Sequence, residues 1–273
     1  MRQKRSLTEL QDICKRVRRE IVEMTGAAKS GHPGGSLSAV ELVVTLYFDH
    51  MNIDPANPKA PGRDRFILSK GHAAPVLYSV FGELGITPKD QLNTLRRVGS
   101  MYQGHPDLRF IPALEASTGS LGNGLSLALG MGCAARLDKQ PWRTYVLLGD
   151  GEIQEGQIWE AAMFGAAHKV DNVVAIVDYN GIQLDGFVKD IMDLEPLVEK
   201  WKAFGWHTLE IDGHHIPAIQ AALAEAEATK GAPTCIVAHT VKGKGVSFME
   251  NNPKWHGVAP TPAEVQLALE ELK

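Results

Sequence analysis

Short runs of β-forming residues recur along the chain and limit its fold more than any other feature. The runs at residues 144–148 and 173–177 are continuously apolar and rich in β-branched side chains, as in strands buried on both faces of a parallel sheet. Further strand-like runs at residues 65–69, 207–211 and 234–238 are separated from them by segments with helical periodicity. Because strands alternate with helices, the sequence predicts an α/β fold, a parallel β-sheet with helices on both faces.

Helix-start signals mark several of the intervening helices. Residues 7–24 carry an apolar stripe at steps of three and four residues. A hydroxyl residue followed three positions later by glutamate forms a capping box, and such pairs occur at Ser6 with Glu9 and at Ser38 with Glu41. Helices are therefore expected to begin after both serines. Further helices are expected near residue 88, at residues 217–230 and after Thr261.

Composition and charge exclude several classes of function. The chain has 273 residues, with 28 Lys and Arg against 32 Asp and Glu and 44% apolar residues. The net charge of -4 argues against a surface that binds nucleic acid or anionic lipid. Neither a signal-peptide core nor an apolar run of about 18 residues is present, so we expect a cytoplasmic protein without a membrane partner. Cys14, Cys133 and Cys235 are few and far apart, which favours neither a disulfide nor a zinc site.

A Gly-Asp-Gly turn directly follows the strand predicted at residues 144–148. Ligands bind beyond the carboxyl ends of strands in an open α/β sheet, which is where Asp150 lies. Gly149 and Gly151 let the backbone approach phosphate oxygens, and the carboxylate between them can ligate a hard divalent cation. The next strand leads to Asn180, whose amide oxygen can join the same cation. A plain tight turn is the alternative, and the pairing of two strand ends favours a metal and phosphate site.

Histidines follow glycines more often than the composition predicts. Imidazoles in such loops can pack around a ligand and suit proton transfer near neutral pH. For each histidine taken alone, a surface or buried structural position is the alternative. The pairs are Gly31-His32, Gly71-His72, Gly104-His105 and Gly213-His214.

The segment from Gly149 to Asn180 resembles the thiamine-diphosphate-binding motif. In that motif an aspartate, an asparagine and one backbone carbonyl hold Mg²⁺ or Ca²⁺ against the diphosphate of the cofactor. The resemblance implies that Asp150, Asn180 and the carbonyl of Ile182 are the metal ligands. It also implies that Gly151 donates its backbone N–H to a phosphate.

Further loops resemble those of transketolase, in the same order along the chain. They are Lys29-Ser-Gly-His32-Pro-Gly, Leu68-Ser-Lys-Gly-His72-Ala, Gln103-Gly-His105-Pro, Glu115-Ala-Ser-Thr-Gly119-Ser-Leu-Gly122 and Trp255-His256-Gly257. The resemblance runs from about residue 15 to 262 and implies the diphosphate domain of the thiamine-diphosphate-binding fold. It implies that the channel to the thiazolium ring is lined by His32, His72, His105 and His256. The implied cofactor contacts are His72, Gly119, Ser120, Leu121, Gly149, Asp150, Gly151 and Asn180, with Ser120 in place of the family's proline.

The same resemblance assigns an interface and a domain organisation. Glu155 and Glu160 match acids through which the family couples its two active sites across the subunit interface, although a helix N-terminus also favours acids for its own reasons. Residues 1–242 are expected to form the diphosphate-binding domain. Residues 243–273 are expected to add an active-site loop and a short helix to that domain. His214 and His215 match no active-site position and are expected at the surface or in a turn.

Transketolase chains ordinarily continue into a pyrimidine-binding domain and a C-terminal domain, and these 273 residues contain neither. The resemblance therefore implies the N-terminal subunit of a two-chain transketolase that is inactive alone. Its expected partner is a C-terminal subunit, in an α2β2 heterotetramer. The implied reaction is the thiamine-diphosphate-dependent transfer of a two-carbon ketol unit from a ketose phosphate to an aldose phosphate.

Two other functions stay open. An α subunit of a 2-oxoacid dehydrogenase shares the cofactor, but the Ser-Gly-His-Pro-Gly and Gln-Gly-His-Pro loops speak against it. A non-catalytic regulatory copy keeps the fold but need not keep Asp150, Asn180 and the four loop histidines. Lys70 stands where Asn is common in the family, and Tyr179 where Asp is common. The sequence therefore leaves the donor sugar, the acceptor sugar and the pathway open.

Overall fold

The computed structural model describes residues 4–184 and 186–273. Its strands are β1 (Arg65–Leu68), β2 (Thr144–Gly149), β3 (Val173–Tyr179), β4 (Ile182–Gln183), β5 (Gly186–Phe187), β6 (His207–Asp212) and β7 (Thr234–His239). Its α-helices are α1 (Leu7–Ala28), α2 (Pro33–Leu37), α3 (Val40–Thr45), α4 (Ala74–Glu83), α5 (Asn123–Leu137), α6 (Gly156–Ala167), α7 (Val188–Ile191), α8 (Leu197–Ala203), α9 (Ile216–Ala228) and α10 (Pro262–Glu271). A π-helical turn spans Leu46–His50, and short 3-10 helices span Gly71–Ala73, Lys89–Thr94, Glu152–Gln154 and Pro253–His256.

A five-stranded sheet in the order β1-β2-β3-β7-β6 forms the centre of the fold. All of its pairings are parallel. Gly149 at the end of β2 lies opposite Asp178 of β3, which brings these two carboxyl ends level. β4 and β5 form a separate antiparallel pair just beyond β3. The parallel sheet predicted from the alternating runs is confirmed.

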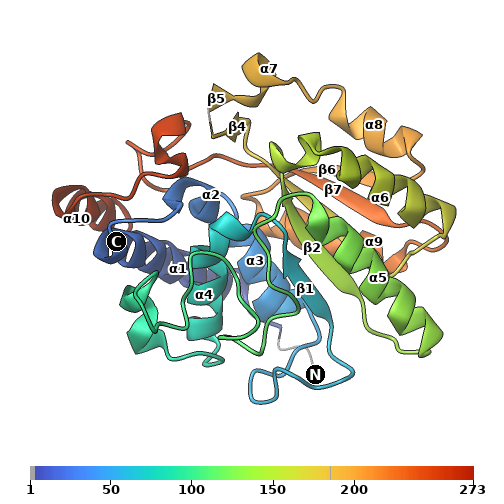
Figure 1. Cartoon of the computed structure of the whole chain (residues 1–273), viewed down its shortest axis with the longest axis horizontal. Coiled ribbons are helices and arrows are strands. Elements are labelled where there is room, and N and C mark those ends of the chain that lie inside the picture. The colour runs from blue at the N-terminus through green and yellow to red at the C-terminus, as the bar shows by residue number, and fades with distance from the viewer. Residues whose placement is uncertain (1–3, 185) are drawn as a thin grey trace.

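Alternate side chains of β1, β2, β3 and β7 point into two different cores. Tyr145 and Leu147 of β2 belong to a cluster that contains the buried faces of α1, α3, α4 and α9. Val146 and Leu148 belong to a second cluster with α5, α6 and α8. Figure 1 shows α5 and α6 on one side of the sheet and α1 and α4 on the other. Helices therefore cover both faces, as predicted, and the carboxyl ends of the strands are left for the site.

The predicted caps at Ser6 and Thr261 are confirmed and the one at Ser38 is wrong, while the helix predicted at residues 217–230 is confirmed as α9. Capping boxes of Ser6 and of Thr261 open α1 and α10. Ser38 caps nothing, because α3 begins after Ala39 and its N-terminus has no side-chain cap. The Ser38 hydroxyl instead donates to Asp178 of β3, at 2.6 Å. The helix expected near residue 88 is the short 3-10 helix Lys89–Thr94.

The C-terminal segment packs on the first helices. The backbone N–H of Gly243 donates to the carbonyl of Gly34 at 3.0 Å, and Trp255 is buried. Arg19 of α1 donates to the carbonyl of Leu269 in α10 at 2.9 Å. This segment therefore lies against α1 and α2. None of the described helices is both long enough and apolar enough to cross a bilayer.

Candidate active site

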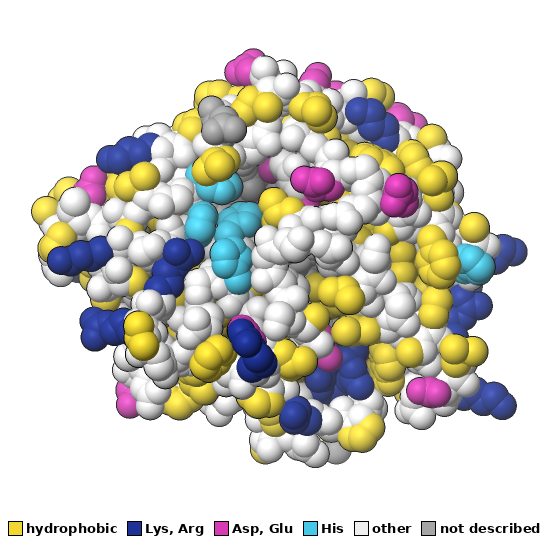
Figure 2. Space-filling view, viewed as in Figure 1, with side chains coloured by type: hydrophobic (Ala, Val, Ile, Leu, Met, Phe, Trp, Pro, Cys, Tyr) yellow, Lys and Arg dark blue, Asp and Glu magenta, His cyan; other side chains and the backbone are white. Residues whose placement is uncertain are grey.

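A pocket of about 550 Å³ lies at the carboxyl ends of β1, β2 and β3. Figure 2 shows histidine side chains gathered beside a hollow on this face of the molecule. The pocket is lined by twelve of the residues predicted for the site, which are His32, His72, His105, Gly119, Leu121, Gly149, Asp150, Gly151, Glu155, Asn180, Ile182 and His256. Ser120 and Glu160 are the predicted residues outside this lining. The loops that were matched separately in the sequence therefore meet at one place.

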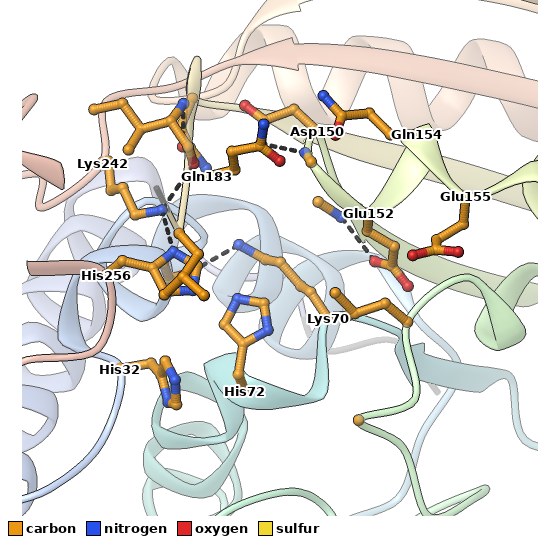
Figure 3. A pocket seen from close by; sticks show the side chains of 18 of the residues that line it. His32, Lys70, His72, Asp150, Glu152, Gln154, Glu155, Gln183, Lys242 and His256 are labelled. Carbon is orange, nitrogen blue, oxygen red and sulfur yellow. Dashed lines mark hydrogen bonds between the residues drawn. The ribbon is translucent and has the colours of Figure 1, made fainter. Parts of the chain in front are cut away.

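The four predicted histidines form a tight group. The ring centroid of His32 lies 5.2 Å from that of His72, 5.5 Å from that of His256 and 6.4 Å from that of His105. Figure 3 shows His32, His72 and His256 grouped at one end of the pocket. His32 caps the amino end of α2, and His72 lies in the 3-10 turn before α4, so each is held by a short helix.

Burial and neighbouring cations keep these imidazoles neutral. Burial, followed by the charge of Arg96, lowers the pKa of His32 to about 4. Burial, followed by the charge of Lys242, lowers the pKa of His256 to about 3. The pKa of His72 is well below its usual range, and that of His105 is lowered, in both cases chiefly by burial. A neutral imidazole donates one hydrogen bond and accepts another, which suits it to hydroxyl groups.

The predicted metal ligands lie at the ends of β2 and β3 and offer only oxygen atoms. Asp150 is 3% exposed, and its carboxylate accepts the backbone N–H of Gly151 at 2.7 Å and that of Gly181 at 2.6 Å. The side-chain oxygen of Asn180 accepts the N–H of Ile182 at 3.2 Å. The pKa of Asp150 is raised to about 6, chiefly by burial and then by the charge of Asp178. Buried carboxylate, amide and carbonyl oxygens form a donor set that suits Mg²⁺ or Ca²⁺.

Two buried lysines also line the pocket, and the sequence alone did not assign them to the site. Lys242 donates to the carbonyl oxygen of Ile182 and to Nδ1 of His256, each at 2.8 Å. Lys70 donates to the carbonyl of Gly35 at 2.8 Å and pairs with Asp178. Both lysines are 2% exposed. Their sequence signal is that each follows a buried strand at its carboxyl end, Lys70 after β1 and Lys242 after β7.

Burial lowers the pKa of the Lys242 ammonium to about 8, with Asp150 acting in the opposite direction. Lys242 is therefore still charged at neutral pH, in a place where water solvates it poorly. Near it, the buried side-chain amide nitrogen of Gln183 has no hydrogen-bond partner among the described residues. A cation and an unpaired N–H donor in one pocket wall suit an anionic ligand.

Glu152, also missed by the sequence analysis, ties the loop before α5 to the end of β2. Its carboxylate accepts the backbone N–H of Gly149 at 2.9 Å and that of Gly122 at 3.0 Å, and also binds the Ser69 hydroxyl. Gly119 in the same loop has a φ of 129°, and a Cβ there would lie 2.6 Å from the ring of His105. This loop can therefore approach the histidines closely only with glycine at that position.

Three predicted residues lie at or beyond the edge of the pocket. Ser120 is exposed, and its hydroxyl and carbonyl both accept from the side chain of Asn123. Glu155 is exposed at the rim. Glu160 on α6 lines a separate depression of about 340 Å³ together with Phe164. Exposed apolar side chains occur on both helices, namely Leu127 of α5 and Met163 and Phe164 of α6, and Phe164 also lines this depression.

His214 and His215 lie in the turn between β6 and α9, as expected. His215 is exposed. The His214 side chain is only 14% exposed and contacts Glu41, so it is a partly buried turn residue and not a surface one.

Comparison with known proteins identifies the family. Residues 10–272 match the family model described as "Transketolase, thiamine diphosphate binding domain". The chain is 44% identical to the 6-deoxy-6-sulfo-D-fructose transketolase subunit SqwG of Clostridium sp. (strain MSTE9), over 97% of this chain and 96% of that protein. It is 43% identical to an apulose-4-phosphate transketolase subunit of Phocaeicola vulgatus, over 93% and 90% of the two chains.

A solved structure gives the same answer. The transketolase of Campylobacter jejuni superposes with a TM-score of 0.92 at 31% identity. The match covers 98% of this chain and 43% of that one, so the chain spans less than half the length of that transketolase. These matches confirm the assignment that the sequence motifs suggested. The chain belongs to the transketolase family, in which it corresponds to the thiamine diphosphate-binding domain.

Proposed function

We propose that this chain is the N-terminal, diphosphate-binding subunit of a two-chain transketolase. The observation that carries the proposal is the convergence in one pocket of four neutral histidines, an oxygen donor set and two buried lysines. The two relatives named as transketolase subunits match along nearly their whole length. We propose a ketose phosphate as the donor of the two-carbon unit and an aldose phosphate as the acceptor.

Asp150, Asn180 and the carbonyl of Ile182 would hold Mg²⁺ or Ca²⁺. The fit is supported by the Ile182 carbonyl, which already accepts from a cation, the ammonium of Lys242. Lys242 and Gln183 would face the diphosphate, since both offer N–H donors inside the pocket. The loop of Gly119, Ser120 and Leu121 and the turn of Gly149, Asp150 and Gly151 would contribute the backbone contacts, as the resemblance implies.

The histidines would act on substrate hydroxyl groups. When bound, thiamine diphosphate supplies the electron sink for breaking the carbon–carbon bond next to a ketose carbonyl. His32 and His256 are neutral, with 5.5 Å between their ring centroids. Arg96 and Lys242 donate to the Nδ1 atoms of the two rings, so each ring carries its proton on Nε2 and can donate it to a substrate oxygen. His72 and His105 also line the pocket beside them.

The remaining part of the site would come from a second chain. The exposed apolar side chains of α5 and α6, together with the exposed Glu160 of α6, fit a face that a partner covers. Leu184 and Met192 add exposed apolar surface at the rim of the pocket itself. We propose that a C-terminal transketolase subunit with the pyrimidine domain docks here in an α2β2 assembly, with Glu155 and Glu160 at the interface.

We also propose that residues 1–242 and 243–273 belong to one domain, since α10 packs on α1 and His256 lies beside Lys242. A 2-oxoacid dehydrogenase subunit has no support among the relatives reported above. A non-catalytic copy is disfavoured because the histidine group and the oxygen donor set are both intact.

Reconstitution tests the proposal. The purified chain, with thiamine diphosphate and Mg²⁺, should show no ketol transfer alone and gain it when mixed with the protein encoded beside it. Full activity of the lone chain would refute the two-chain assignment. In the complex, Asp150→Ala should abolish metal-dependent cofactor binding, whereas the exposed Asp138→Ala should not change it. Calorimetry that gives Asp150→Ala the affinity of the unmodified complex would refute the metal assignment.

A further inference from the structure

Outside the pocket, three polar side chains form a buried chain of contacts that the proposed reaction does not use. Arg18 of α1, Glu41 of α3 and His214 of the β6–α9 turn have side-chain exposures of 7%, 11% and 14%. At one end of this chain His214 contacts the backbone of Val241, and at the other end Arg18 contacts the backbone of Lys244, on either side of Lys242. We propose that this Arg18–Glu41–His214 chain positions Lys242 in the pocket, so that His214 is a positioning residue for cofactor binding; the inference rests on the proposed function.

The contacts of His214 define one protonation state. The backbone N–H of Val241 points to Nε2 of His214 at 2.8 Å. A backbone N–H can only donate, so Nε2 accepts and carries no proton. The ring proton is therefore on Nδ1, which donates to the carboxylate of Glu41 at 2.9 Å. In this neutral tautomer both ring nitrogens are used, one toward α3 and the other toward the residue before Lys242.

Glu41 is in turn fixed by Arg18. The guanidinium of Arg18 contacts the Glu41 carboxylate at 2.7 Å, and its Nε donates to the carbonyl of Lys244 at 3.0 Å. The pKa of Glu41 is lowered although burial acts in the opposite direction, because Arg18 and His214 stabilise its charge. The backbone around Lys242 is thus held by two hydrogen bonds, one at Val241 before it and one at Lys244 after it.

The turn is built for this close approach. A Cβ at Gly213 would lie 2.5 Å from the methyl group of Thr240, so only glycine lets the β6–α9 turn reach the end of β7. This accounts for the Gly213-His214 pair, which the active site did not explain. The Lys242 ammonium itself contacts uncharged atoms, the Ile182 carbonyl and the His256 ring. The position of the ammonium therefore depends on the position of the Lys242 backbone. A functional group needs supporting residues that fix its position.

A double-mutant cycle separates positioning from a general contribution to stability. In the reconstituted complex with Mg²⁺, the dissociation constant of thiamine diphosphate is measured for His214→Ala, Lys242→Ala and the double variant. His214→Ala alone should weaken binding about tenfold, the effect of losing hydrogen bonds that fix a charged group. If His214 acts through Lys242, its substitution should change affinity less than about threefold once Lys242 is already alanine.

Three further variants make the result specific. His214→Gln keeps a donor and an acceptor and should restore part of the lost affinity, whereas the exposed neighbour His215→Ala should have no effect. The same cycle is run with His214→Asn, so that the outcome does not depend on the alanine variant folding. The inference would be overturned, with the proposed function left intact, by either of two results. One is an equal loss of affinity with lysine and with alanine at position 242, and the other is unchanged affinity in both His214→Ala and His214→Asn. Failure of the unmodified complex to bind thiamine diphosphate would refute the proposed function instead.

Discussion

The buried ion pair of Lys70 and Asp178 provides a direct test of how charged side chains beside the pocket contribute to stability. Asp178, near the end of β3, has no exposed surface and accepts from Lys70, from the Ser38 hydroxyl at 2.6 Å and from the Thr240 hydroxyl. Its pKa is lowered because Lys70 and these hydroxyls outweigh the effect of burial. Asp178→Asn removes the charge and keeps the shape, which leaves the Lys70 ammonium with the Gly35 carbonyl.

The expected cost follows from that uncompensated charge. Removing one partner of a buried ion pair destabilises a protein by about 3–5 kcal/mol. At roughly 2–4 °C per kcal/mol for a chain of this size, the unfolding midpoint should fall by about 6–20 °C. Lys70→Met should cost a similar amount, because Asp178 then keeps only its hydroxyl partners. The double variant has no buried charge at this position and should be more stable than either single variant.

Urea unfolding followed by circular dichroism measures these free energies, and the three variants with the unmodified chain form a complete cycle. Unfolding free energies of both single variants within about 1 kcal/mol of the unmodified chain would refute the reasoning, since exposed pairs contribute no more than that. A double variant that loses the sum of the two single losses would also refute it, because charge compensation predicts that the losses do not add.

Two other predictions concern the histidines. His32→Ala and His256→Ala in the reconstituted complex should lower kcat much more than they weaken thiamine diphosphate binding, and the opposite pattern in steady-state kinetics would remove them from the substrate channel. Stability should fall as the pH drops from about 6.5 toward 4. The pKa values of His32, His72, His105 and His256 are lowered in the folded state, so the unfolded chain binds more protons in this range. Asp150, Glu152 and Glu20, whose pKa values are raised, act in the opposite direction, but they are three groups against four. Urea unfolding that gives equal or greater stability at pH 5 than at pH 7 would contradict this.

The sequence predicts the sheet well because the signal for a buried parallel strand is local. The runs at residues 144–148 and 173–177 need no information beyond their own apolar β-branched side chains. The motifs after them are also local, since the turn that carries Asp150 begins where its strand ends. Parallel strands bring such turns together at one edge, so the convergence of Asp150 and Asn180 follows from topology alone.

Local sequence patterns mislead where a side chain has a stronger partner in a distant segment. Ser38 and Glu41 have the spacing of a capping box, whose contribution is about 1 kcal/mol. Each has a charged and buried partner elsewhere, Asp178 for Ser38 and Arg18 for Glu41. Hydrogen bonds to charged groups contribute about 1.5–3 kcal/mol, so the long-range partners prevail. For the same reason, the local signals at Lys242, which follows a buried strand, and at His214, which follows a glycine, do not reveal the distant groups that these side chains contact.

The charges left over in the pocket support the proposal that a metal and a diphosphate bind there together. Lys70 is paired with Asp178, and Glu152 is satisfied by backbone N–H groups. Asp150 and Lys242 are also buried, but within residues 4–184 and 186–273 neither forms an ion pair. A buried carboxylate is stabilised by a bound cation, and a buried ammonium is stabilised by a bound anion. A divalent metal at Asp150 and a diphosphate beside Lys242 would each neutralise one of them and also bind one another. Neither ligand alone would satisfy both charges, so each is expected to raise the affinity of the site for the other.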